Sequence, residues 1–177
     1  MPPRALFLDR DGVINLDHGY VHRREDFDFV DGIFDLVAAG CRRGFLPVVV
    51  TNQSGIGRGY YTEADFAALM RWVAAEFAAR GTPLARIEHC PDHPESATPR
   101  RKPGPGMLLD AAAALGLDLA GSIMVGDQPG DMEAARRAGV ETRILVSADA
   151  ALAARAPAAT LVLPSVRDTA RWLAARG

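Results

Sequence analysis

The sequence is poor in cysteine. Its two cysteines, Cys41 and Cys90, stand far apart among 177 residues, which excludes the disulfide framework of small secreted domains. Long apolar runs are absent too: none approaches the ~18 residues of a membrane span, and the N-terminal run is too short for an export signal. We therefore expect a cytoplasmic protein with reduced thiols and no membrane partner.

Long basic runs are also lacking. The formal net charge is −2, so the composition gives no reason to expect a nucleic acid partner. Hydrophobic residues make up 49% of the chain and charged residues 24%, which is ordinary for a globular protein with a real core. Neither an internal repeat nor a linker divides the chain. We expect a single domain over residues 1–177, present as a monomer.

Short apolar runs alternate with helical patterns along the chain. The apolar runs predict strands at residues 5–9, 45–51, 85–90, 121–127, 142–146 and 160–164. Helical patterns predict helices at residues 32–44, 62–81, 105–116, 131–139 and 165–176, while residues 147–159 fit a surface helix or a loop. This alternation predicts an α/β fold, a Rossmann-like parallel sheet with helices on both faces, and leaves no room for a large cap domain.

Carboxylates gather where two of these strands end. Asp9 and Asp11 are two residues apart, so an extended backbone points both the same way, and Asp127 and Asp131 follow the fourth strand. For Asp11 and the glycine after it alone, a simple turn is the better interpretation. Four acids at two strand ends, without histidine, instead favour a hard cation with oxygen ligands, and Mg²⁺ is the best candidate.

Donors for an anion follow the second strand and precede a helix. Thr51 begins the string "TNQSG", which offers a hydroxyl and amides to a phosphate, although a hydrogen-bonded turn would use the same residues. Lys102 stands between prolines just before a predicted helix, whose N-terminus adds a positive dipole. Together with the carboxylates, these groups predict a phosphate site at the carboxyl edge of the sheet.

The order of these motifs resembles the haloacid dehalogenase (HAD) superfamily of phosphatases. The resemblance covers residues 6–146: a DxD pair, a hydroxyl, a lysine and a final GDxxxD, each after its own strand. The strings "FLDRDGVIN", "DHGYV", "TNQSGIGRGYYT", "CPDHP" and "RKPGPGML" are similar to the heptose 1,7-bisphosphate phosphatase and histidinol-phosphatase family. The fold that this implies is HAD-like, with the site covered by loops.

The resemblance also implies roles for the residues that match its motifs. Asp9 would be the nucleophile, and Asp11 would protonate the leaving oxygen and then activate water. Thr51 and Lys102 would hold the phosphoryl oxygens. The implied Mg²⁺ ligands are Asp9, Asp127 and the backbone carbonyl of Asp11, with the Asp11 side chain as a further ligand.

The resemblance implies a phosphorylated sugar as the substrate and a set of residues that contact it. Two of them have simpler alternatives, because Tyr20 could pack against a loop and Arg58 could be a solvated surface charge. The implied substrate-binding residues are Asp17, His18, Gly19, Tyr20, Asn52, Gln53, Ser54, Arg58 and Arg101.

Three functions are compatible with these residues. The leading hypothesis is Mg²⁺-dependent removal of the 7-phosphate of D-glycero-D-manno-heptose 1,7-bisphosphate through an aspartyl-phosphate, in the supply of lipopolysaccharide precursors. A histidinol-phosphate or general sugar-phosphate phosphatase is the first alternative. A non-catalytic protein that binds phosphate ligands on the same fold is the second, and the intact acidic residues argue against it.

The sequence departs from the resembled family in two places. The family carries a zinc loop with a Cys-x-His pair and a Cys-x-Cys pair before Arg-Lys; here Cys90 remains, Asp92 replaces the histidine, and His93 is displaced. No Cys-x-Cys precedes Arg101, and recruiting His89 would strain a tetrahedral site, so we expect no structural zinc. Gln128 stands where the heptose enzymes often carry lysine, which weakens the prediction of substrate but not that of phosphatase chemistry.

Overall fold

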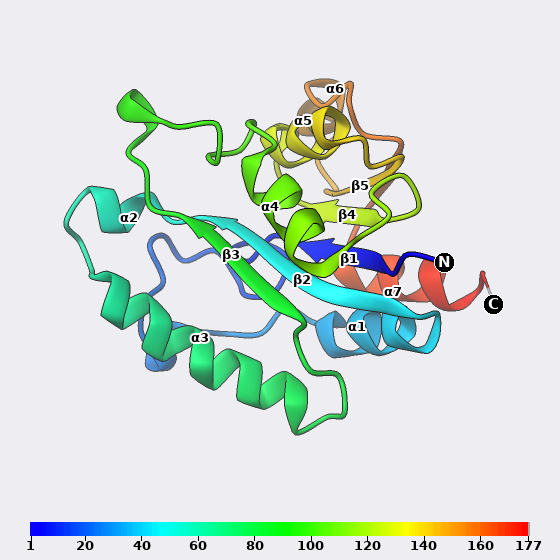
Figure 1. Ribbon diagram of the computed structural model, residues 1–177, viewed down its shortest axis with the longest axis horizontal. Helices are drawn as coiled ribbons and strands as arrows, with labels where there is room; N and C mark the ends of the chain where they lie inside the picture. Colours follow the sequence, from blue (N-terminus) through cyan, green and yellow to red (C-terminus); the bar gives the residue numbers. More distant parts are fainter. Residues whose placement is uncertain (177) are drawn as a thin grey trace.

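The computed structural model describes residues 1–176, and its centre is a six-stranded sheet in which all pairings are parallel (Figure 1). The strand order is β3-β2-β1-β4-β5-β6. The chain therefore winds outward from β1 to β3, returns to the other side of β1, and winds outward again, so that the switch point lies between β1 and β4. The strands are β1 (Arg4–Leu8), β2 (Phe45–Asn52), β3 (Arg86–Cys90), β4 (Ile123–Gly126), β5 (Thr142–Val146) and β6 (Leu161–Leu163).

Helices connect the strands and cover both faces of the sheet, which confirms the predicted fold class (Figure 1). The α-helices are α1 (Ile33–Arg42), α2 (Ser54–Gly57), α3 (Glu63–Ala78), α4 (Gly106–Leu115), α5 (Pro129–Ala138), α6 (Ala150–Ala154) and α7 (Val166–Ala174). Two short 3₁₀ helices, η1 (Arg24–Asp26) and η2 (Pro94–Ser96), lie in the loops that follow β1 and β3.

Most predicted elements match the structure to within a few residues, and the differences have local causes. Helix α3 ends at Ala78, three residues earlier than predicted, because the N–H groups of Arg80 and Gly81 bond to carbonyls three residues back and close the helix as a tight turn. Helix α2 was not predicted because four residues are too few to display a helical period. Helix α6 lies in the segment that the sequence left as helix or loop.

The alternation of side chains along β1 divides the core into two layers. Leu6 and Leu8 pack into the layer that contains the buried residues of α1, α3 and α7. Ala5 and Phe7 point to the opposite face and pack with buried residues of α4 and α5. Figure 1 shows the same division, with α1, α3 and α7 below the sheet and α4, α5 and α6 above it.

Loops rather than a separate domain cover the carboxyl edge of the sheet. The chain between β1 and α1 contains only η1, and the chain between β3 and α4 contains only η2. No cap domain is therefore inserted within residues 1–176, as predicted. In the same part of the chain, every helix is too short or too polar to cross a membrane.

We expect the N-terminal cap of α3 to contribute measurably to stability. The Thr62 hydroxyl accepts the Asp65 N–H at 3.1 Å, and the Asp65 carboxylate accepts the Thr62 N–H at 2.8 Å. Thr62→Ala should lower the free energy of unfolding by about 1 kcal/mol, because the Asp65 N–H loses its acceptor. Urea titration measures the effect, and Thr62→Ser, which keeps the hydroxyl, should stay close to wild type. An unchanged midpoint for Thr62→Ala would contradict this prediction.

Candidate active site

A cavity of about 450 Å³ opens at the carboxyl edge of the sheet, at the switch point between β1 and β4. The ends of β1, β2 and β4 and the loop before α4 contribute its lining. Of the predicted site residues, those in the lining are Asp9, Asp11, Asp17, Gly19, Tyr20, Asn52, Gln53, Ser54, Lys102 and Asp127. Four further residues line it that were not among the predicted site residues: Tyr61, Gln128, Gly130 and Asp131.

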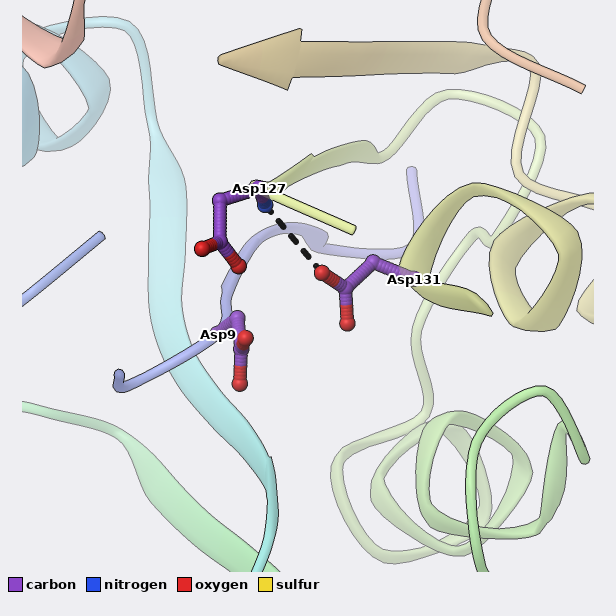
Figure 2. Close-up of side chains that lie close together, drawn as sticks. All are labelled: Asp9, Asp127 and Asp131. Atoms are coloured by element: carbon purple, nitrogen blue, oxygen red, sulfur yellow. Dashed lines mark hydrogen bonds between the residues drawn. The ribbon is translucent and has the colours of Figure 1, made fainter. Parts of the chain in front are cut away.

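Three of these aspartates form a tight cluster. One carboxylate oxygen from each of Asp9, Asp127 and Asp131 lies within 4.8 Å of the others (Figure 2). Burial and then the charge of Asp131 raise the pKa of Asp9 well above its ordinary value of 3.8, and they raise the pKa of Asp127 to about 6. Asp9 and Asp127 therefore resist being ionised together unless a cation lies beside them.

The cluster has the chemistry of a Mg²⁺ site. All its donors are carboxylate oxygens, and Oδ1 of Asp127 is buried without a hydrogen-bond partner among residues 1–176. The backbone is shaped to allow the approach: Gly12 has φ +89°, and a Cβ there would lie 2.0 Å from Oδ2 of Asp127. The residues present thus fit a hard divalent cation.

Asp131 lies at the base of the cluster and orients it. Its Oδ2 accepts the backbone N–H group of Asp127 at 3.1 Å (Figure 2). It also accepts the backbone N–H group of Gln128 at 3.0 Å, and the two bonds fix the turn between β4 and α5. Its Oδ1 lies 2.7 Å from Nζ of Lys102. The sequence identified Asp131 as a strand-end carboxylate, but it was not among the predicted metal ligands.

Lys102 places a buried positive charge against the cluster. Its Nζ donates to Oδ1 of Asp9 at 2.9 Å and to the carbonyl of Val50 at 2.8 Å, in addition to Asp131. Burial lowers the pKa of Lys102, but Asp131 and Asp9 outweigh it, so that the pKa is raised overall. The ammonium group therefore stays charged.

The Asp9 carboxylate has two unequal oxygens. Oδ1 accepts from Lys102 and also from the Arg10 N–H at 2.8 Å. Within residues 1–176 no hydrogen bond is donated to Oδ2. One oxygen is thus held in place while the other is free to react.

Asn52 holds the Lys102 loop to the end of β2. Its side-chain amide donates to the Lys102 carbonyl at 3.0 Å and accepts the Lys102 N–H at 3.0 Å. Both polar atoms of this predicted substrate-binding side chain are therefore engaged in positioning the lysine.

The Asp11 side chain lies outside the three-carboxylate cluster. Its Oδ1 accepts from Arg10 at 2.7 Å and from Asn15 at 3.1 Å, and its Oδ2 accepts from Gln53 at 3.0 Å. Gln53 also donates to Oγ1 of Thr51 at 2.9 Å. Thr51 itself is fully buried and is not among the residues that line the cavity.

Three predicted substrate-binding residues are not brought to the cavity. His18 is turned away toward Asp28, with Nε2 2.8 Å from its carboxylate. Arg58 is exposed beside the cavity, and its Nε donates to the Ser54 hydroxyl at 3.4 Å. Arg101 is half-buried and donates to the backbone carbonyl of Asp92 at 3.4 Å. Sequence neighbours of cavity residues thus need not face the cavity themselves.

Asp92 and His93, two of the residues considered for a zinc loop, form hydrogen bonds within the loop. Asp92 accepts the N–H and hydroxyl of Thr98 at 2.7 and 2.6 Å, and His93 accepts the Glu95 N–H at 3.2 Å. Within residues 1–176 they join no group of three or more metal-ligating side chains.

The other two candidates for zinc ligation are His89 and Cys90, and the Cys90 thiol is hydrogen-bonded to Asp92. His89 lies 2.6 Å from the carboxylate of Glu63 on α3. Burial raises the pKa of the Cys90 thiol, which disfavours the thiolate that zinc requires.

Comparison with known proteins assigns the chain to a family. A model of HAD-hydrolase-like proteins matches residues 99–169. The chain is 47% identical to a D-glycero-beta-D-manno-heptose-1,7-bisphosphate 7-phosphatase of Vibrio cholerae, over 98% of this chain and 97% of that protein. The chain belongs to the heptose-1,7-bisphosphate 7-phosphatase family.

Other members of this family are equally similar or share the structure. A D-glycero-alpha-D-manno-heptose-1,7-bisphosphate 7-phosphatase of Burkholderia mallei is also 47% identical, over 100% of this chain and 97% of that protein. A D,D-heptose 1,7-bisphosphate phosphatase from B. bronchiseptica, solved with magnesium and phosphate, superposes with a TM-score of 0.88. It is 30% identical, and the match covers 98% of this chain and 99% of that one.

We expect Mg²⁺ to stabilise the protein more at neutral than at acidic pH. The pKa of Asp127 is about 6 in the folded protein, whereas its ordinary value is 3.8. The protonated Asp127 therefore contributes fully to folding stability at pH values below 3.8, and this contribution is lost as the pH rises through 6. The pKa of Asp9 is shifted in the same direction. Mg²⁺ at the ionised carboxylates should offset this loss.

The measurement is the melting temperature with and without Mg²⁺. At a hundredfold excess over the dissociation constant the increase should be about 5–10 °C near pH 7.5, and clearly smaller near pH 5. Asp127→Asn should remove most of the increase at neutral pH. An increase of the same size at both pH values would contradict the assignment of the cluster.

Proposed function

We propose that this chain is a Mg²⁺-dependent phosphatase that removes the 7-phosphate of D-glycero-D-manno-heptose 1,7-bisphosphate through an aspartyl-phosphate. The observation that carries the proposal is the Asp9 carboxylate. Lys102 holds its Oδ1 at 2.9 Å, its Oδ2 accepts no hydrogen bond within residues 1–176, and the residue lines the cavity. Membership of the heptose bisphosphate phosphatase family supports the choice of substrate.

In the first step, Oδ2 of Asp9 attacks phosphorus as the bond from phosphorus to the sugar oxygen breaks. The bonding electron pair leaves with the sugar oxygen, which takes the proton of the Asp11 carboxyl group. The products are an aspartyl-phosphate at Asp9, the sugar alcohol and the Asp11 carboxylate.

In the second step, the Asp11 carboxylate takes a proton from a water molecule whose oxygen attacks phosphorus. The acyl-phosphate bond breaks, its electron pair returns to the Asp9 carboxylate, and inorganic phosphate leaves. Asp11 ends the cycle protonated, as it began, so the two carboxylates are ready for another turnover.

The reaction requires positive charge, because a phosphate monoester and a carboxylate repel each other. Asp9, Asp127 and the backbone carbonyl of Asp11 would hold Mg²⁺, which would supply part of that charge. The Lys102 ammonium group supplies more beside the attacking carboxylate. We further propose that the Thr51 hydroxyl contacts the phosphoryl oxygens; since it accepts from Gln53, its own hydrogen is the one it donates.

The sugar is proposed to lie against Asp17, Gly19, Tyr20 and Ser54, which line the cavity. Arg58 lies beside Ser54 and is proposed to contact the distal phosphate, and Arg101 to assist Lys102 in recognition. We propose that the protein acts in the cytoplasm as a monomer without structural zinc, in the supply of heptose for lipopolysaccharide precursors. The two free cysteines support the location.

Asp9→Asn should abolish phosphate release while the fold is retained. The loss should be at least about a thousandfold, because the nucleophile is gone. The fold should survive, since the substitution relieves repulsion with Asp131 and Asp127 and leaves Lys102 its contact with Asp131. Phosphate release and circular dichroism are measured together, with the exposed Asp35→Asn as the matched control. Substantial turnover by Asp9→Asn would refute the covalent mechanism.

Among phosphate monoesters, heptose 1,7-bisphosphate should have the highest kcat/KM. We expect its kcat/KM to exceed that of histidinol phosphate by tenfold or more, because histidinol phosphate lacks a second phosphate. Tenfold is about the effect of losing one charge-assisted contact. The panel should include both anomers, since relatives named for each are 47% identical to this chain. Faster turnover of histidinol phosphate would favour the alternative function.

A further inference from the structure

A buried tyrosine contacts the catalytic groups through one glutamine. The Tyr61 hydroxyl donates to Oε1 of Gln53, whose own side chain is almost fully buried. The amide nitrogen of Gln53 donates in turn to Oδ2 of Asp11 at 3.0 Å and to Oγ1 of Thr51 at 2.9 Å. All the strong hydrogen-bonding capacity of Gln53 is therefore directed at protein groups of the site.

These contacts select one orientation of the Gln53 amide. If the amide were turned over, its carbonyl oxygen would face the Asp11 carboxylate, and two acceptors would oppose each other. Burial raises the pKa of Tyr61 to about 12, so its hydroxyl keeps its proton and remains a donor to the carbonyl. Without that hydroxyl the carbonyl would be buried with no donor, and the side chain would be free to leave its position.

Tyr61 is itself fixed by its surroundings. Its ring stacks on His22, with ring centroids 4.8 Å apart and planes at 7°. On another side it lies against Gly55, where a Cβ would come within 2.1 Å of the ring. The hydroxyl is thus presented to Gln53 from a rigid support.

The opposite oxygen of Asp11 is held from another direction. Arg10 is fully buried, and one terminal nitrogen donates both to Oδ1 of Asp11 at 2.7 Å and to the carbonyl of Val21 at 2.6 Å. Asn15 donates to the same Oδ1 at 3.1 Å. Gln53 is the side chain that restrains the Oδ2 end, so a change in Gln53 alters the direction of the carboxyl group.

We propose that Tyr61 is a positioning residue for proton transfer: its hydroxyl orients the Gln53 amide, which aims the Asp11 carboxyl group at the leaving oxygen. The inference rests on the proposed phosphatase activity. It also assigns Gln53 to the support of Asp11 and Thr51 rather than to recognition of the sugar.

The leaving group distinguishes this role from a general loss of structure. A sugar oxygen is a poor leaving group and must take the Asp11 proton as its bond to phosphorus breaks. The p-nitrophenolate ion leaves without a proton, so formation of the aspartyl-phosphate from p-nitrophenyl phosphate does not need an aimed Asp11. The later attack of water on the intermediate needs Asp11 for both substrates.

The test is Tyr61→Phe, which removes the hydroxyl and keeps the ring. With heptose 1,7-bisphosphate, kcat should fall about 10- to 100-fold, while KM changes less than about twofold. The loss in kcat is smaller than that expected from removing a general acid altogether, because Asp11 is still present. With p-nitrophenyl phosphate, rapid mixing should show a first turnover at the wild-type rate followed by a slower steady state. An equal slowing of the first turnover with both substrates would overturn the proposal.

A second variant tests the same chain of contacts without changing Tyr61. Gln53→Met removes the amide at similar volume and should show the same dependence on the leaving group. The double variant should be no slower than Gln53→Met, because both changes break one chain of contacts. Losses that multiply in the double variant would refute the link through Gln53.

Thr82→Val is the matched control. It removes a buried hydroxyl that donates to the Phe77 carbonyl at 3.1 Å, away from the cavity, and should leave both substrates at wild-type rates. The outcomes distinguish a failure of the proposed function from a failure of the inference about Tyr61. A wild-type protein that releases no phosphate from either substrate refutes the proposed function, whereas an active wild type with an unaffected Tyr61→Phe refutes only the inference.

Discussion

The repulsion among Asp9, Asp127 and Asp131 is the constraint around which the site is organised. Three carboxylates within 4.8 Å of one another, two of them buried and that of Asp127 partly buried, are opposed by the buried ammonium group of Lys102. That charge offsets only part of theirs, since the pKa values of Asp9 and Asp127 remain raised. The excess negative charge favours a divalent cation at the cluster. Because of this excess negative charge, the position of the Lys102 ammonium group among the carboxylates must be fixed.

The backbone fixes the positions of the carboxylates. Parallel pairing brings the ends of β1, β2 and β4 to one edge, and the switch point leaves a cavity there. Gly12 and Gly126 allow the turns after β1 and β4 to approach: a Cβ on the first would strike Asp127, and on the second Asp131. The carboxylates are therefore placed by rigid turns, which explains how repelling groups are kept at short range.

Residues next to a strand end could be predicted, and residues that act through another side chain could not. Asp9, Asp127 and Lys102 follow from motif order, because the sheet brings strand ends together whatever the loops do. Tyr61 is eight residues beyond Gln53, and no pattern in the sequence indicates that its hydroxyl returns to that amide. His18 was predicted to contact the substrate, but its contact with Asp28 turns its side chain away from the cavity that Gly19 lines. Side-chain direction in a loop depends on tertiary contacts that periodicity does not encode.

The loop of residues 91–105 is held by two separate sets of contacts. Its outer part is tied by Asp92 to Thr98, whereas the delivery of Lys102 depends on the two bonds to Asn52 and on the three contacts of Nζ. Lys102 is thus anchored to the sheet and not to the outer loop. The two sets of contacts share no residue. The departures from the zinc pattern therefore fall in the outer part of the loop and not among the contacts that position Lys102.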